Sequence, residues 1–159
     1  MVEIEEMGAT EMHELLRQVN YGHLGCSRDG HSYVVPIHYA HHRDDFYFFT
    51  TEGMKTEYIS ANPEVCLQVE EVQDQFNWCS VIVTGKAILL TSQEDTEQAL
   101  EYITQVNPTL TPALNKMWVD AWGRASKVAI YRIQPNTISG RKTLPQGESR
   151  GPVVIQKKD

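Results

Sequence analysis

Short apolar segments rich in Val, Ile and aromatic residues follow one another along this chain, separated only by turns or brief polar stretches. Residues of these types favour β-strands, and strands joined by short connections pair antiparallel. Several segments, 32–37 among them, are apolar on both faces, so both faces of the sheet need a cover. We therefore predict a mainly β fold, a barrel closed on itself and flanked by helices or by a second subunit. The six predicted strands cover residues 22–27, 31–42, 46–51, 64–72, 78–90 and 128–133.

Apolar residues recur at helical spacing in stretches that begin or end at capping residues. A loop with a short helix is expected over 108–123, where Trp118 and Trp122 share one helix face. These tryptophans serve either as core or dimer contacts or as a stack for a cofactor. The other predicted helices cover 11–19, 54–62 and 93–106, opened by Thr10, Gly53 and Ser92.

Composition limits what kind of molecule this is. With 41% hydrophobic and 22% charged residues over 159 positions, we expect one globular domain, residues 1–147, followed by a flexible tail, 148–159. The net charge of −7 argues against non-specific binding to nucleic acid or to an acidic membrane. No apolar run approaches the ~20 residues of a membrane span, and the acidic first residues differ from a secretory signal.

The three cysteines, Cys26, Cys66 and Cys79, have no CxxC spacing. Their odd number argues against a disulfide framework or a zinc site, and favours a cytoplasmic protein. Because each lies in an apolar strand, we expect buried, unreactive thiols, while a catalytic cysteine–histidine pair stays open. The motifs of serine hydrolases, P-loop proteins and Rossmann dinucleotide-binding proteins are absent.

A candidate anion site lies where the strand 46–51 runs into a helix. Thr50 and Thr51 end the strand, and Gly53 and Lys55 begin the helix. Free amides at a helix N-terminus, nearby hydroxyls and one lysine together suit a phosphate group. The alternative is an ordinary exposed lysine on an amphipathic helix.

All six histidines lie within the first 42 residues, without the spacing of a metal site, so no metal is predicted. His41 and His42 fall at a turn, where solvated side chains are expected. His38 lies within an apolar strand and is either a core histidine or a group that faces a pocket. The six are His13, His23, His31, His38, His41 and His42.

Taken in order, four segments resemble a known family: GHLGCSRDGHSYVVPIHY, DDFYFFTTEGMKTEYISANPEVCLQV, WCSVIVTGKAILL and IYRIQPNTISGRKT. They are similar to the FMN-binding split-barrel superfamily of pyridoxamine-phosphate-oxidase-like proteins, and within it to the nitroimidazole-resistance branch. The resemblance covers about residues 10–143. It implies a six-stranded antiparallel split barrel that forms a homodimer, with two FMN molecules in clefts at the subunit interface.

The resemblance also implies which residues contact FMN. Family members hold the phosphate with an Arg-Lys pair; here the lysine is Lys55, but Met54 stands at the arginine position. Arg141 and Lys142 are candidates for the missing positive charge, across the dimer. His38, near the expected flavin ring, is the candidate catalytic proton donor. The remaining implied contacts are Val34, Val35, Pro36 and Ile37 beside the ring, Phe49, Thr50 and Thr51 along the ribityl-phosphate, and Ser80 near the flavin.

The function implied is an FMN-dependent oxidoreductase that passes electrons from a reduced nicotinamide to a small acceptor of the nitroaromatic or quinone type. Pyridoxamine phosphate is not the expected substrate, because the Arg-x-His of the true oxidases is absent near the C-terminus. Three alternatives stay open: a haem-binding or haem-degrading split barrel, a non-catalytic flavin-binding protein, and a deazaflavin relative.

Overall fold

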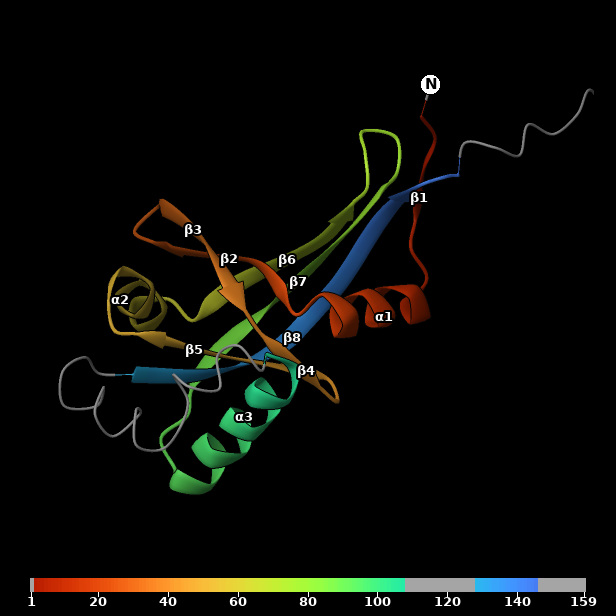
Figure 1. The fold of residues 1–159 in the computed structure, drawn as a ribbon. Coiled ribbons are helices and arrows are strands. Elements are labelled where there is room, and N and C mark those ends of the chain that lie inside the picture. Colours follow the sequence, from red (N-terminus) through yellow and green to blue (C-terminus); the bar gives the residue numbers. More distant parts are fainter. Residues whose placement is uncertain (1, 108–127, 146–159) are drawn as a thin grey trace, which may run out of the picture.

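The computed structural model describes residues 2–107 and 128–145, which form three helices and eight strands (Figure 1). The tail at 148–159 and the expected short helix with Trp118 and Trp122 lie outside the described residues. None of the described helices is long and apolar enough to cross a membrane. In chain order the elements are β1 (Ile4–Glu6), α1 (Ala9–Val19), β2 (Tyr21–Arg28), β3 (His31–His38), β4 (Ala40–His42), β5 (Asp45–Thr51), α2 (Met54–Ala61), β6 (Glu64–Val72), β7 (Trp78–Leu89), α3 (Gln93–Val106) and β8 (Val128–Thr143).

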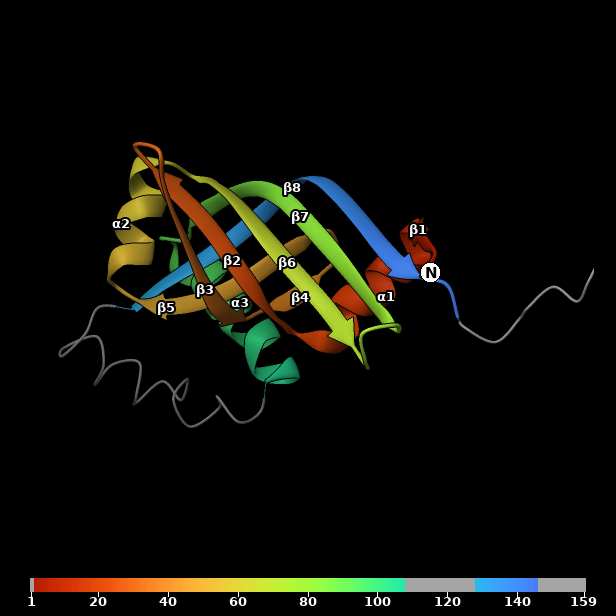
Figure 2. The same ribbon diagram turned by 90° about the horizontal axis from the view of Figure 1, so that it is seen from above.

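All strand pairs are antiparallel, and the sheet has the order β3-β2-β6-β7-β8-β5-β4, with β1 added beside β8. The sheet curls around a single large core, as a split barrel does (Figure 2). Within the described residues the end strands β3 and β4 do not pair with each other, so the predicted closed ring is wrong. The predicted mainly β, antiparallel split-barrel fold is confirmed.

Eight strands replace the predicted six for two reasons. The segment 31–42 divides at Tyr39, whose amide donates to the Asn20 carbonyl at 3.1 Å and whose hydroxyl donates to the Leu16 carbonyl at 2.7 Å. These bonds hold Tyr39 at the break between β3, which pairs with β2, and β4, which pairs with β5. The other added strand is β1, which pairs with the far end of β8.

The last strand is also much longer than predicted, with 16 residues. The prediction stopped at Ile133 because Pro135 and Asn136 are poor strand residues. The structure accommodates them with a bulge in β8, because Thr84 pairs with Thr137 and Gly85 with Pro135, which leaves Asn136 without a partner on β7. A Cβ atom on Gly85 would lie 2.2 Å from the Gln134 carbonyl oxygen, so only glycine lets β8 cross there.

The helices cover the ends and one side of the curled sheet (Figure 2). The buried Leu15 and Leu16 of α1 and Ile59 of α2 enter the main core, whereas α3 packs against β4 and β5. Ser92 caps α3 as predicted, accepting from the Asp95 amide at 3.1 Å. Thr10 does not cap α1, because Gly8 adopts the extended cap conformation and its carbonyl accepts from Met12.

Candidate functional site

The outer face of β3, β2, β6, β7 and β8 collects part of the predicted site. Side chains alternate along β3, so Val34, Pro36 and His38 are exposed on this face, while Val35 and Ile37 point toward the core. The four residues expected beside the flavin ring are therefore divided between two faces. No described helix packs on this outer face, whose exposed apolar side chains include Tyr21, Val34 and Ile82.

Ser80 and Arg141 also lie on this face, directly opposite each other on β7 and β8. They line a hollow of about 530 Å³ between these strands and the turn from β1 to α1, with Met7, Met12 and Trp78. Among the described residues no carboxylate lies within ion-pair distance of Arg141. The structure thus brings together Ser80 and one of the two predicted C-terminal cations.

Lys142, the other predicted cation, is turned toward β1 and α1 instead. Its Nζ lies 3.2 Å from Glu5 and 2.6 Å from Glu11. The hydrogen bond with Glu11 and then that with Glu5 raise the pKa of Lys142, and the same bond from Lys142 lowers the pKa of Glu11. Its charge is thus already matched by two carboxylates within its own chain.

A row of hydrogen-bonded polar side chains crosses the outer face, and sequence reasoning missed it. Gln68 on β6 donates from Nε2 to Ser80 Oγ and to Glu70 Oε2, both at 3.0 Å, while its Oε1 lies 3.2 Å from His23 Nδ1. The signal was present in the sequence, because Gln68 and Glu70 interrupt an apolar strand at two-residue spacing. What the sequence does not give is the pairing of β2 with β6.

The start of α2 has the features expected of an anion site. Lys55 is half-buried, and no carboxylate of the described residues lies within ion-pair distance of it. The first intrahelical bond runs from the Glu57 amide to the Gly53 carbonyl, which leaves the amides of Met54, Lys55 and Thr56 without intrahelical acceptors. These groups fit a phosphate carried by a flavin nucleotide.

The strand that leads into α2 presents its residues to different sides. Thr50 is buried, and its hydroxyl donates to the Thr51 carbonyl at 3.1 Å, whereas Thr51 is exposed next to the helix start. Phe49 lies on the opposite side of β5 from Thr50 and packs near α3 with Tyr47 and Leu100. Thr51 and Lys55 are thus the residues of the predicted phosphate site that a ligand can reach in the isolated chain.

The histidines near the turn are not solvated, which corrects the prediction. His41 stacks on Phe46, with ring centroids 4.3 Å apart, and on His13 at 5.6 Å. Burial, and then the nearby His13 and Arg17, lower the pKa of His41 to about 4. His42 stacks on Tyr102 of α3 at 3.9 Å. The helices α1 and α3 pack back onto β4 and leave both rings half-buried, an effect that no local pattern reveals.

His38 is not a core histidine. It is exposed at the end of β3, and its ring meets the edge of Tyr21 at 5.2 Å. The exposed ring excludes the core interpretation that was open at the sequence level. No described hollow is lined by His38 itself.

The cysteines are free thiols, as expected, but only Cys26 is buried; Cys66 and Cys79 are half-buried. Burial raises the pKa of all three thiols, and the nearby Lys55 opposes this at Cys26. A raised pKa leaves little thiolate at neutral pH, so these cysteines are poor nucleophiles. Nowhere in 2–107 or 128–145 do three His, Cys, Asp or Glu side chains come together as metal ligands do.

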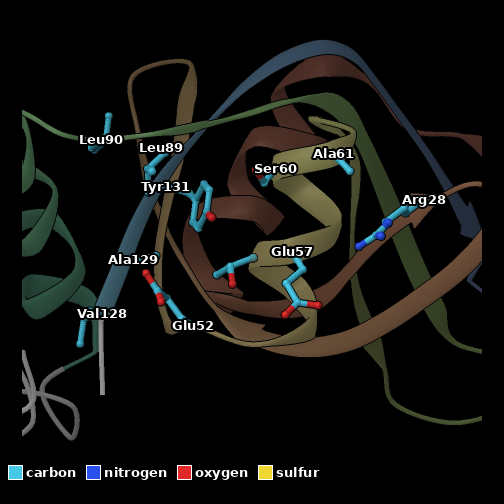
Figure 3. Close-up of a pocket in the computed structure, with 11 residues that line it drawn as sticks. Arg28, Glu52, Glu57, Ser60, Ala61, Leu89, Leu90, Val128, Ala129 and Tyr131 are labelled. Carbon is cyan, nitrogen blue, oxygen red and sulfur yellow. The ribbon is translucent and has the colours of Figure 1, made fainter. Parts of the chain in front are cut away.

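A hollow of about 720 Å³ beside α2 contains none of the predicted site residues. Glu57 and Ser60 of α2 form one wall, and Leu89 and Tyr131 stand opposite (Figure 3). Glu52 and Glu57 line this hollow together with Arg28, so its lining carries charges of both signs (Figure 3).

Comparisons with known proteins concern the family and the fold. The family model described as pyridoxamine 5'-phosphate oxidase matches residues 8–142. A protein of Rhizobium meliloti (strain 1021) with no characterized function is 35% identical over 83 residues, 52% of this chain and 55% of that protein. The chain thus spans about half the length of this curated relative.

Two solved structures share the fold over nearly the whole chain. An FAD-binding protein from Mesorhizobium loti is 28% identical, with a TM-score of 0.76 over 91% of this chain and 100% of that one. A proposed 5-nitroimidazole antibiotic resistance protein from Bacteroides thetaiotaomicron is 18% identical, with a TM-score of 0.70 over 90% and 89% of the two chains. At that lower identity the likeness concerns the fold alone.

Proposed function

Since this chain belongs to the pyridoxamine 5'-phosphate oxidase family, we propose that it is a flavin-binding oxidoreductase. The proposed cofactor is FMN, the electron donor is a reduced nicotinamide, and the acceptor is a small nitroaromatic or quinone. Binding of FAD by the Mesorhizobium loti protein, which is 28% identical, supports a flavin. When bound, the flavin supplies the redox chemistry, and the protein supplies position, exclusion of water and protons.

The observation that carries the proposal is the start of α2. A half-buried lysine without a carboxylate partner in the described chain stands beside free helix amides and the exposed Thr51. A lysine left unpaired in a strongly acidic chain suits a ligand phosphate better than a structural role. The exposed apolar side of β3, with Val34 and Pro36, then offers a wall for the ring.

We propose a homodimer as the functional unit. Val34 is 63% exposed, Ile82 42% and Tyr21 41%, and all three lie on the outer sheet face that no described helix covers. A second copy packed there would bury these side chains. It would also bring Ser80 and Arg141 of one subunit toward the ring bound by the other.

The first experiment compares the absorption spectrum of the purified protein before and after addition of FMN. We expect the two-band flavin spectrum to survive desalting. Lys55→Ala should weaken FMN binding about 10- to 100-fold, the value of a charge-assisted hydrogen bond. Lys86→Ala is the matched control, because Lys86 already lies 3.7 Å from Glu64 on the surface. Equal affinities of the two variants would contradict the phosphate site.

The same samples separate the alternatives. Steady turnover of a reduced nicotinamide with a quinone or nitroaromatic supports the oxidoreductase, whereas bound flavin without turnover identifies a flavin-binding protein that is not an enzyme. Tighter binding of FAD than of FMN would change the cofactor, and a Soret band would replace flavin with haem. Sedimentation of the flavin-loaded protein tests the dimer.

A further inference from the structure

His23 is held in one place on the outer face by the close approach of β2 and β6. The two residues pair directly in the sheet, His23 opposite Gln68. A Cβ atom on the preceding Gly22 would lie 2.6 Å from the Gln68 carbonyl oxygen, so a glycine is required for the strands to come this close. The half-buried His23 ring also meets the edge of Tyr21 at 5.9 Å.

Donor and acceptor rules fix the protonation of this imidazole. The ionised Glu70 carboxylate can only accept, so the group of Gln68 that faces it at 3.0 Å is the amide NH₂. The Gln68 oxygen then faces His23, and since that oxygen can only accept, the His23 Nδ1 carries the proton. In the neutral ring Nε2 is left as a bare acceptor.

Space for a ligand lies beside this ring. Tyr21, Gly22, His23, Glu70 and Val72 line a hollow of about 220 Å³, enough for the edge of a heterocycle rather than for a whole cofactor. On the other side of His23, the register places Pro36 of β3 directly opposite. His23 therefore lies between the wall proposed for the flavin ring and the polar row formed by Gln68, Glu70 and Ser80.

We propose that His23 Nε2 accepts a hydrogen bond from a ring N–H of the bound ligand, the imide N–H of the flavin, and that Gln68 is the positioning residue that holds the proton of the neutral ring on Nδ1. This inference rests on the proposed function for the identity of the ring, but not for the chemistry of the acceptor. An N–H flanked by carbonyl groups is the class of ligand edge that a fixed neutral imidazole recognises.

Binding of FMN and of 3-methyl-FMN, which lacks this N–H, tests the contact. The wild-type protein should bind FMN about 3- to 10-fold more tightly than the methylated compound, the value of one neutral hydrogen bond. His23→Leu should lower this ratio to about one. His31→Leu is the matched control, since His31 is exposed at the far end of β3, and it should keep the ratio. A ratio unchanged in His23→Leu overturns the proposal.

A measurement without any ligand tests the positioning role and does not depend on the His23 variant folding. Nitrogen-15 NMR of the wild-type apoprotein should show the His23 imidazole protonated at Nδ1. Gln68→Met should shift it toward the Nε2–H form that free histidine prefers. A wild-type ring protonated at Nε2 would overturn the inference.

Uridine monophosphate carries the same imide and a phosphate without the tricyclic ring, so it separates the two proposals. If it binds more tightly than FMN, and His23→Leu abolishes its binding, the acceptor role holds and the flavin assignment fails. If FMN binds and its N–H makes no difference, the flavin assignment holds and the role of His23 fails.

Discussion

His23 and His41 lie on opposite faces of the same curled sheet, and their surroundings use the imidazole in opposite ways. His23 faces outward, and its Nδ1 has a partner in Gln68. His41 faces inward between Phe46 and His13, and neither of its ring nitrogens has a hydrogen-bond partner among the described residues. On the inner face, the His41 ring packs as an aromatic group that must stay neutral. On the outer face, the proposed role of the His23 ring is that of a fixed hydrogen-bond acceptor. The face of the sheet decides which property is used.

The two sites should differ most in their effect on the free energy of unfolding when each histidine is replaced by a residue that is always positively charged. His41→Lys places a permanent charge on the Phe46 ring and beside His13 and Arg17, with Asp44 as a nearby group of opposite charge, and should lower the free energy of unfolding by about 3–5 kcal/mol. His23→Lys can extend its amine into solvent, so its cost should stay below about 1 kcal/mol. Denaturant unfolding of both variants at pH 7 measures the difference. Similar losses would mean that the two sites are equally buried.

Lowering the pH should also reduce the free energy of unfolding through His41, by less than the His41→Lys substitution does. Because the folded pKa of His41 is about 4 and its ordinary value is 6.5, the unfolded chain takes up a proton before the folded one does. This contribution to stability is complete above about pH 6.5 and is lost as the pH falls toward 4, by at most about 3 kcal/mol after allowance for solvent screening. His41→Phe should flatten that part of the curve of unfolding free energy against pH. His23→Phe should leave that part of the curve unchanged. If His23→Phe flattens the curve instead, the assignment to His41 is wrong.

The smallest expected effect concerns two adjacent cations on β8, one with carboxylate partners and one without. Lys142 is engaged by Glu5 and Glu11, whereas Arg141 faces outward. Lys142→Met should therefore change FMN affinity less than twofold, while Arg141→Met should weaken it about 3- to 10-fold. Fluorescence titration of FMN into each variant is sufficient. A larger loss in the Lys142 variant would show that its carboxylate partners release it on binding.

Elements with local signals could be predicted well. The helix α3 and the strand β6 have the predicted bounds, because a serine cap in one and a run of strand-forming apolar residues in the other are local signals. The break at Tyr39 could not be predicted, since it depends on a hydroxyl that reaches Leu16 in another element. A local pattern likewise gave no sign that β1 would extend the sheet.

The site follows the same rule. Lys55 could be proposed from the strand, glycine and helix around it, all within a few residues. The fate of Lys142 depends on Glu11, which lies 131 residues away in sequence, and the fixing of His23 depends on Gln68, 45 residues away. Sequence patterns identified residues able to bind a phosphate, but only the fold shows which charges are already used and which acceptors are held still.

The long strand β8 has a consequence for how the chain is made. Within the described sheet, β5 and β4 reach the β2–β6–β7 layer only through β8, which pairs with β7 on one side and with β5 on the other. During synthesis, therefore, the aromatic strand β5 leaves the ribosome long before its partner does. Until residue 133 has emerged, Phe46 and Phe48 cannot be enclosed in the finished core. The nascent chain therefore exposes an apolar strand edge that must be kept from pairing with other chains.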